Sequence, residues 1–398
     1  MASPPCCVDS PTCSCYNGRG WRHSVELILT RDPEALNRLR EEWDDLLSRS
    51  VGATVYQTWE WNEAWWSVHG RRKRLLLLEF RDGGRLIGLA PLYVGHHLST
   101  PLRRAAFLGT GPSDYLGVIA DDAHATAVAE RLLDFVCEAR GFDLADLQQV
   151  RPSALLDAAA ERCSHTVGDG RRVHLVTQEP CPQVVLPPSW SAYTSRLGKK
   201  MRSNIAYAQR RLARDFGTVE MNLAASSELP AAMTSLFDLH QRRWRSRLLP
   251  GVLGTERVRR FHRIVAERFA ARGWLRLHLL RIDGAVRAAL YCFRYRDRYY
   301  YYLGGFDPAL SRYSIGTLLT SDAIRQAIDE GCATFDFLRG AEPYKYRWAV
   351  EERFNHRVLL AHPASLRARA MLHLNRIERL VEMRAKAFAE RRGRVHAT

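Results

Sequence analysis

The sequence predicts an α/β protein with a mixed sheet, built from two copies of one domain. Residues 75–94 and residues 275–295 are both apolar strand pairs joined by a tight turn that contains Asp-Gly. This dipeptide supplies the positive φ angles that a two-residue hairpin requires. After each hairpin come, in the same order, a β-rich stretch, a helix and a short strand. A repeat about 200 residues apart indicates a duplicated domain.

The elements that follow the hairpins can be matched one by one. Each predicted helix ends before a glycine, Gly141 or Gly331, a residue that commonly terminates helices. The matched segments are the β-rich stretches 105–120 and 298–310, the helices near 123–139 and 314–330, and the strands 143–150 and 333–340.

Two further helices are predicted between the copies, at 199–216 and 230–247, after a proline-rich linker. Met201, Ile205, Ala208 and Leu212 share one face of the first helix. We therefore expect four regions: a disordered Cys-rich tail at 1–22, domains at 23–180 and 181–362, and a basic C-terminal helix within 363–398.

Composition limits the function. The net charge of +16 comes from five lysines and fifty-four arginines, an imbalance typical of GC-rich coding, so it is weak evidence for an anionic ligand. No apolar run is long enough to span a membrane, and the N-terminus lacks the apolar core of a signal peptide. We therefore expect a cytoplasmic protein. The tail cysteines lack the spacing of a zinc site, so no metal is predicted.

The start of the helix near 314 is a candidate anion site. A glycine-bearing turn and Ser314 precede it, so its backbone N–H groups and positive dipole end would face an approaching phosphate. Arg312 lies close by in sequence. An ordinary capped helix is the alternative. No P-loop or dinucleotide fingerprint is present.

The stretch 335–349 places five charged residues among aromatic ones, and charges in a core are costly unless they are paired or used. Strand alternation sends Asp336 to the face opposite Phe335 and Phe337. Either ion pairs such as Asp336–Arg339 and Glu342–Lys345 fix this loop, or the charges line a cleft at the strand's end.

His240 is a second candidate, because histidine is easily tuned near neutral pH. It shares a helical face with Trp244, and a buried, hydrogen-bonded histidine is the alternative.

Three segments together resemble the CelD/BcsL family of acetyltransferases, a branch of the GNAT superfamily: 335–349, 240–244 and 56–66. The resemblance covers residues 25–362. It implies tandem GNAT-like domains and direct transfer from an acyl thioester, acyl-CoA or acetyl-CoA, to an acceptor amine. It implies catalytic roles for His240, Glu342 and Asp336. The implied substrate-binding residues are Arg339, Lys345, Tyr344, Trp348 and Trp244, and the implied donor-binding residues are Arg312, Ser314, Gly316 and Thr317.

The resemblance leaves the acceptor open. A sphingoid base, as in ceramide formation, and a sugar of an exopolysaccharide are both implied, and the basic C-terminal helix would suit peripheral contact with the inner face of a membrane. The pyrophosphate motif after Arg312 is degenerate, so an acyl-carrier protein or an aminoacyl-tRNA, as in Fem-type transferases, stays open as donor. Nucleic acid is otherwise not expected. A non-catalytic accessory protein of polysaccharide synthesis is the remaining alternative.

Overall fold

The computed structural model describes residues 25–96, 100–139, 141–164, 172–245, 251–361, 365–368 and 370. The predicted tail at 1–22, with its cysteines, lies outside the described residues, and so does most of the predicted C-terminal helix. Among the described residues, no helix combines the length and apolar composition needed to cross a bilayer.

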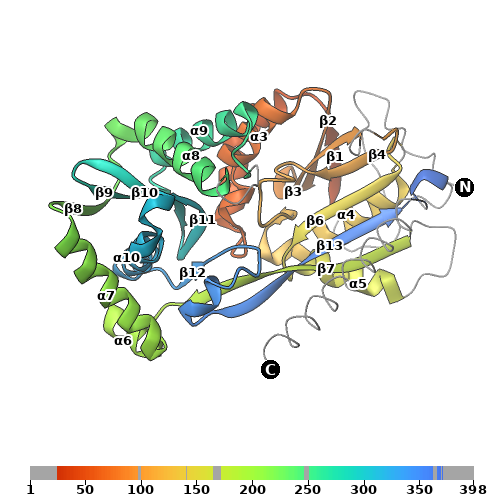
Figure 1. The fold of residues 1–398 in the computed structure, drawn as a ribbon. Helices are drawn as coiled ribbons and strands as arrows, with labels where there is room; N and C mark the ends of the chain where they lie inside the picture. The colour runs from red at the N-terminus through yellow and green to blue at the C-terminus, as the bar shows by residue number, and fades with distance from the viewer. Residues whose placement is uncertain are drawn as a thin grey trace, which may run out of the picture.

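The described strands form one mixed sheet of thirteen (Figure 1). Its order is β1-β2-β3-β4-β6-β13-β7-β12-β11-β10-β9-β8, and β5 pairs with β3. The first copy supplies β1 (Glu26–Thr30), β2 (Arg74–Asp82), β3 (Arg85–His96), β4 (Arg103–Phe107), β5 (Ile119–Ala120) and β6 (Leu144–Val150). The rest are β7 (Arg172–Val185), β8 (Val219–Leu223), β9 (Leu275–Ile282), β10 (Ala285–Tyr295), β11 (Arg298–Phe306), β12 (Thr334–Asp336) and β13 (Glu351–Ala361).

The predicted repeat is confirmed. The hairpin β2–β3, then β4, α4 (Ala125–Glu138) and β6, match the hairpin β9–β10, then β11, α10 (Ile315–Asp329) and β12. One detail of the prediction was wrong. Asp82 pairs with Arg85, so the first turn uses Gly83 and Gly84, both with positive φ, because two adjacent glycines adopt that conformation more easily than Asp-Gly. The second turn uses Asp283 and Gly284, as predicted.

The two copies share one sheet because a late strand joins them. β13 lies between β6 and β7 and pairs antiparallel with both. β7 is long enough to pair with β13 along most of its length and with β12 at its end. The predicted boundary between residues 180 and 181 therefore falls inside β7.

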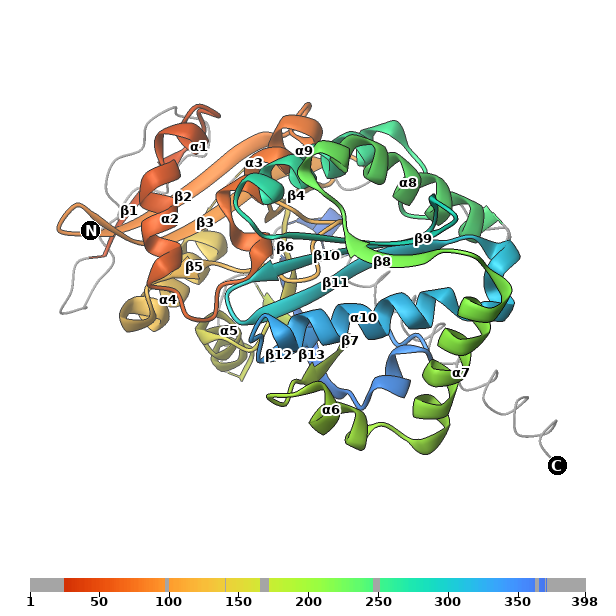
Figure 2. The same cartoon turned by 90° about the vertical axis from the view of Figure 1, so that its left-hand side faces the viewer.

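Helices cover both faces of the sheet (Figures 1 and 2). One apolar cluster runs beneath α2 (Arg40–Ser48), α3 (Trp59–His69), α8 (Leu229–Arg245) and α9 (Glu256–Ala271), and so belongs to both copies. A second lies beneath α4 and α5 (Ala154–Ser164). A third lies beneath α6 (Trp190–Arg196), α7 (Lys199–Asp215) and α10. The short α1 (Ala35–Arg38) precedes α2.

The predicted helices 199–216 and 230–247 are α7 and α8, and the four predicted apolar residues of α7 are its buried ones. α3 and α9 were not predicted from periodicity. They pack on each other across the two copies, with the rings of Trp61 and Phe261 5.0 Å apart and edge to face.

Candidate functional site

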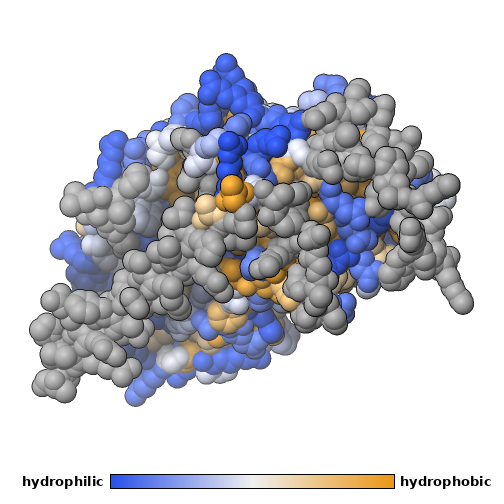
Figure 3. Space-filling model, turned by 90° about the vertical axis from the view of Figure 1, so that its right-hand side faces the viewer, coloured by the Kyte–Doolittle hydropathy of each residue, from blue (hydrophilic) through white to orange (hydrophobic). Residues whose placement is uncertain are grey.

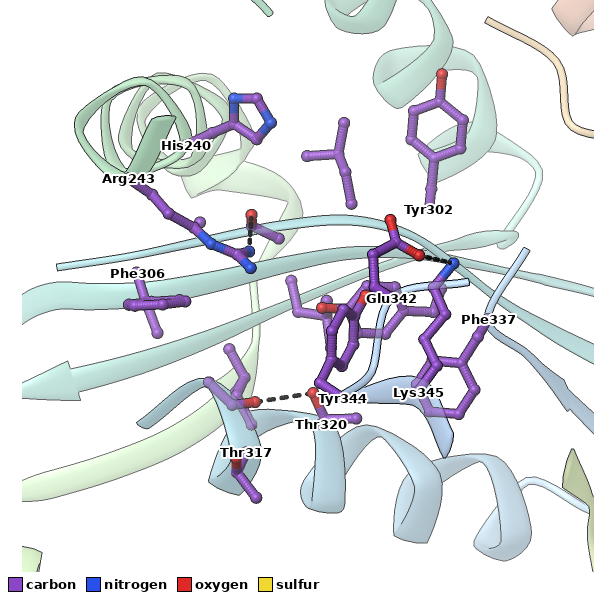
Figure 4. A pocket seen from close by; sticks show the side chains of 18 of the residues that line it. His240, Arg243, Tyr302, Phe306, Thr317, Thr320, Phe337, Glu342, Tyr344 and Lys345 are labelled. Carbon is purple, nitrogen blue, oxygen red and sulfur yellow. Dashed lines mark hydrogen bonds and ion pairs between the residues drawn. The ribbon is translucent and has the colours of Figure 1, made fainter. Parts of the chain in front are cut away.

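A pocket of about 620 Å³ opens where β11 and β12 part. The two strands run parallel and pair from Arg298–Thr334 to Tyr300–Asp336. β12 then ends, whereas β11 continues to Phe306. The pocket occupies the gap that this leaves, so one edge of β11 borders it beyond Tyr300. Its walls come from α8, α10, the segment after β12 and the loop that follows β4 (Figure 4).

A glycine of β11, Gly305, allows helix α8 to form one wall. A Cβ atom on Gly305 would lie 2.4 Å from the backbone nitrogen of His240, so only glycine permits this close packing. The carbonyl oxygen of the preceding Gly304 accepts a hydrogen bond from Arg243 of α8 (3.4 Å). The guanidinium of Arg243 lies over the ring of Phe306, 4.7 Å from its centroid.

One end of the pocket lies at the N-terminus of α10. Ser314, Gly316 and Thr317 line it. Ser314 is left-handed (φ 54°) and makes no side-chain cap, and the first turn of α10 contains no acidic residue. The first N–H groups of the helix therefore lack a side-chain acceptor, an arrangement that suits a phosphate. We call this the α10 end.

Arg312, which was expected to contribute to the α10 end, does not line the pocket. Its guanidinium donates to the hydroxyl of Tyr313 (3.0 Å) and lies over that ring, 4.9 Å from the centroid. The cations that do line the pocket are Arg243, Arg339, Lys345 and Arg347. Arg243 gave no signal in the sequence, because its position depends on how α8 packs.

The other end lies between the two copies of the repeat and holds two ion pairs; we call it the interdomain end. Lys345 Nζ pairs with Glu342 (2.9 Å), as one predicted alternative stated. Lys345 is 3% exposed, and its Nζ also donates to the carbonyl oxygens of Leu338, Arg339 and Gly340. Glu342 is 55% exposed. Lys345 therefore holds the loop, while the carboxylate of Glu342 stays accessible from the pocket (Figure 4).

The second ion pair differs from the predicted Asp336–Arg339 pair. Arg339 Nε pairs instead with Asp114 (3.0 Å), which comes from the loop after β4 in the first copy. Asp114 is 6% exposed, and the hydroxyl of Tyr56 donates to it (3.2 Å). Burial raises the pKa of Asp114, and Arg339 opposes that shift. The sequence held no sign of this residue, because it lies more than 200 residues away along the chain.

Asp336 does not line the pocket. It is fully buried and accepts hydrogen bonds from the Tyr115 hydroxyl (2.7 Å), the Gln183 amide (2.9 Å) and the backbone N–H of Leu338 (2.8 Å). Burial raises its pKa to about 6, although the hydrogen bonds from Tyr115 and Leu338 lower it. The predicted alternation is confirmed, since Phe335 and Phe337 face the cluster beneath α10. Asp336 thus joins the two copies behind the pocket.

His240 and Trp244 both line the pocket and are bonded to each other. The indole N–H of Trp244 donates to Nε2 of His240 (2.8 Å). Burial, with help from Arg243 and Arg259, lowers the pKa of His240 to about 4. The imidazole is therefore neutral at pH 7, and its Nε2 lone pair is occupied, which makes it a poor base in this arrangement.

The remaining predicted residues, Tyr344 and Trp348, form the aromatic floor of the pocket with Tyr301 and Phe337. Ten of the twelve predicted site residues thus share one pocket, and Asp336 and Arg312 lie outside it.

Comparisons with known proteins agree with this geometry. Residues 199–346 match the model of the acetyltransferase (GNAT) domain, and no curated protein matches the chain. A crystal structure of FemX aligns over 81% of this chain and 96% of its own, with 10% identity and a TM-score of 0.59. The C-terminal domain of a putative lysylphosphatidylglycerol synthetase from Agrobacterium fabrum aligns over 85% of this chain and 95% of its own, with 13% identity and a TM-score of 0.52. The structure of L-PGS from Bacillus licheniformis aligns over 85% of this chain and 95% of its own, with 12% identity and a TM-score of 0.52.

At these identities the structures report the fold alone, and that fold is the predicted tandem α/β architecture. The domain match covers the part of the chain that builds most of the pocket, from α7 to the loop after β12. The match of residues 199–346 to the acetyltransferase (GNAT) domain supports an N-acyltransferase, and the tandem GNAT-like fold carries its pocket in the second copy.

Proposed function

We propose that this protein transfers an acyl group from acyl-CoA to the amine of a lipid or sugar acceptor. The observation that carries the proposal is the pocket itself. It joins the uncapped N-terminus of α10 to an accessible carboxylate, Glu342, along the bare edge of β11. A donor phosphate would bind at one end, and an acceptor amine would meet a base at the other.

The distance between the two ends fits a donor with a long arm. Phe306 lies beside the α10 end and Tyr302 beside the interdomain end. Four strand residues span about 13 Å. A pantetheine arm would lie along the edge of β11, with its phosphate at Ser314, Gly316 and Thr317 and its thioester toward Tyr302.

Transfer needs one base and one oxyanion site. The amine nitrogen forms the new bond to the thioester carbon, and the carbon–sulfur bond breaks, so that the sulfur leaves as a thiolate, which takes up a proton from solvent to give the free thiol. Glu342 accepts the amine proton. Backbone N–H groups on the free edge of β11 stabilise the oxyanion. Lys345 keeps the Glu342 carboxylate in place, since its ammonium is itself held within hydrogen-bonding distance of three backbone carbonyl oxygens.

Of the other candidates for the base, His240 is neutral with its Nε2 engaged, and Asp336 lies behind the pocket. We assign His240 and Trp244 to the wall that shapes the acceptor's entry. Asp114 and Arg339 close the interdomain end and would orient the acceptor.

The acceptor is proposed from the resemblance to the CelD/BcsL family, which points to an exopolysaccharide sugar or a sphingoid base. A Fem-type reaction with an aminoacyl-tRNA donor is the second candidate, since the FemX fold is similar. A non-catalytic accessory role is the third, and the accessible carboxylate in a built pocket argues against it.

The test is donor and acceptor together. Purified protein is incubated with acetyl-CoA or a long-chain acyl-CoA and a panel of amines (sphinganine, amino sugars, amino acids), and thiol release and product mass are followed. Thiol release that depends on one acceptor supports the proposal and names the acceptor class. Absence of release across the panel, combined with salt-sensitive tRNA binding, would contradict it and favour the Fem-type reaction.

A further inference from the structure

One face of helix α7 is strongly basic and lies beside the α10 end of the pocket. Lys199, Lys200, Arg210 and Arg214 are exposed on the side of the helix opposite its buried residues. We call these four residues the α7 basic face. Among the described residues, Lys199, Lys200 and Arg210 form no ion pair, and Arg214 pairs with Asp215 (2.7 Å).

The first turn of α7 concentrates positive charge where a helix tolerates it least. Its N-cap, Gly198, has no side chain that could cap the helix, and the first turn contains no acidic residue. Two lysines at the positive end of the helix dipole are unfavourable for the free protein. An anionic partner would relieve that repulsion.

Contacts connect the α7 basic face to the pocket. Met201, two residues after Lys199, lines the pocket. Near the other end of α7, Arg211 donates to the carbonyl oxygen of Arg312 (3.3 Å) and lies over the ring of Tyr313, just before α10 begins. A molecule bound along α7 would therefore lie beside whatever enters the α10 end.

The α10 end itself offers few groups that bind phosphates. It has one helix N-terminus without a side-chain cap and, over the ring of Phe306, the guanidinium of Arg243, whereas Arg312 is turned onto Tyr313. This suits the single phosphate of a phosphopantetheine arm. The α7 basic face, on a helix of 17 residues and about 25 Å, is longer than the remaining phosphates of CoA would need.

We propose that the physiological donor is an acyl-phosphopantetheine arm carried by an acidic carrier protein, which docks on the α7 basic face. The proposal rests on the acyltransferase function proposed above. The reaction is unchanged: the acyl carbon leaves the arm's sulfur for the acceptor nitrogen, and the carrier is released as a free thiol. Acyl-CoA then acts as a smaller donor that has the same arm but lacks the carrier protein.

Other polyanions fit this face less well. Tyr207 is the only exposed large apolar or aromatic side chain on the described residues of α7, whereas RNA readers stack bases on several aromatics. A membrane-binding helix needs apolar residues to insert. Figure 3 shows apolar residues among hydrophilic ones on the side of the molecule that faces away from α7.

The experiment compares two donors of the same acyl group on two charge-reversal variants. The test variant is K199E/K200E/R210E. The control is R257E/R260E, on α9, which covers the opposite face of the sheet (Figure 2). Both changes place acidic residues in the first turns of a helix or on its exposed surface, so both variants are expected to fold.

For the wild type, kcat/KM with the acylated carrier should exceed that with acyl-CoA and should fall steeply as salt is added. The kcat/KM of the test variant with the acylated carrier should fall about tenfold or more, as expected when charges that steer a partner are reversed. Its activity with acyl-CoA and the control's activity with both donors should stay within about twofold.

Equal losses with both donors would overturn the proposal, because the face would then serve CoA. A wild type that prefers acyl-CoA would overturn it too. If neither donor releases thiol with any acceptor, the proposed function fails instead, and docking is decided by calorimetry with the unacylated carrier. Binding that the test variant alone loses supports docking; no binding, or binding only to RNA or anionic vesicles, overturns it.

Discussion

Asp146 in β6 and Asp336 in β12 occupy matching positions of the repeat, each five residues after the glycine that follows its helix. Both are fully buried. Asp146 pairs with Arg357 (2.6 Å) and Arg104 (3.1 Å), and these cations lower its pKa despite burial. Asp336 has only neutral donors, and burial raises its pKa to about 6. Partners, not position in the fold, decide the charge state.

The gaps after these strands differ as well. In the first copy the chain returns into the gap, where the backbone N–H of Leu116 donates to Gln149 (2.9 Å) and Leu116 bridges to Val150. In the second copy the gap is the pocket. The helix starts do not differ in this way. Asp121 accepts from Ala123 ahead of α4 and Asp307 accepts from Ala309 ahead of α10, and neither helix has a side-chain cap or an acidic residue in its first turn. One copy has closed its gap and stabilises the fold, and the other keeps it open.

The largest expected effect is on catalysis in the open copy. Glu342→Gln should lower kcat by about 10²- to 10⁴-fold, the usual contribution of a general base. The melting temperature should change little, because Lys345 keeps three carbonyl partners. Steady-state kinetics and thermal unfolding on the same preparation measure both. Intact turnover with a large loss of stability would make this ion pair structural.

The next effect is on the stability of the closed copy. Asp146→Asn should lower the free energy of unfolding by roughly 3–5 kcal/mol at pH 7, because it leaves the buried charges of Arg104 and Arg357 uncompensated. The native pKa of Asp146 is depressed, so its contribution is present above the unfolded pKa of about 3.9 and lost as the pH falls through the native value. Urea denaturation should show that the difference in free energy of unfolding between wild type and variant becomes smaller below about pH 4.

Asp336→Asn should show the opposite pH dependence. The native pKa of Asp336 is raised, so its favourable contribution is full below about pH 3.9 and is lost as the pH rises through about 6. This amounts to about 3 kcal/mol across that window. The free energy of unfolding of the variant, relative to that of the wild type, should therefore be higher at pH 8 than at pH 4.5. Parallel stability profiles of the two proteins would show that Asp336 titrates normally.

The smallest effect concerns the helix starts. Ser314→Asp would give α10 an acidic residue at its N-cap, where it has none. Asp tolerates the left-handed conformation of this position. The added charge should weaken CoA binding several-fold, or about 1 kcal/mol, measured by calorimetry, whereas Ser314→Asn should bind CoA nearly as the wild type does. Equal binding by all three proteins would place the phosphate elsewhere.

The sequence predicted features that depend on neighbours along the chain. The second hairpin turn, the buried face of α7 and the alternation around Asp336 follow from local geometry and periodicity, and all three are confirmed. Because the repeat preserves their order, the tandem fold followed as well. Ten of the twelve predicted site residues cluster because they lie on three segments around one strand gap: α8, the start of α10 and the segment after β12.

Only the tertiary structure decided which charges meet. Arg339 pairs with Asp114, more than 200 residues away, and Arg243 takes the place expected for Arg312. Nothing local marks such partners, because an ion pair depends on where a side chain ends in space. The same holds for His240, whose neutrality comes from burial and Trp244. Local propensity fixes the elements, whereas burial and pairing across the fold set each group's charge and so its chemistry.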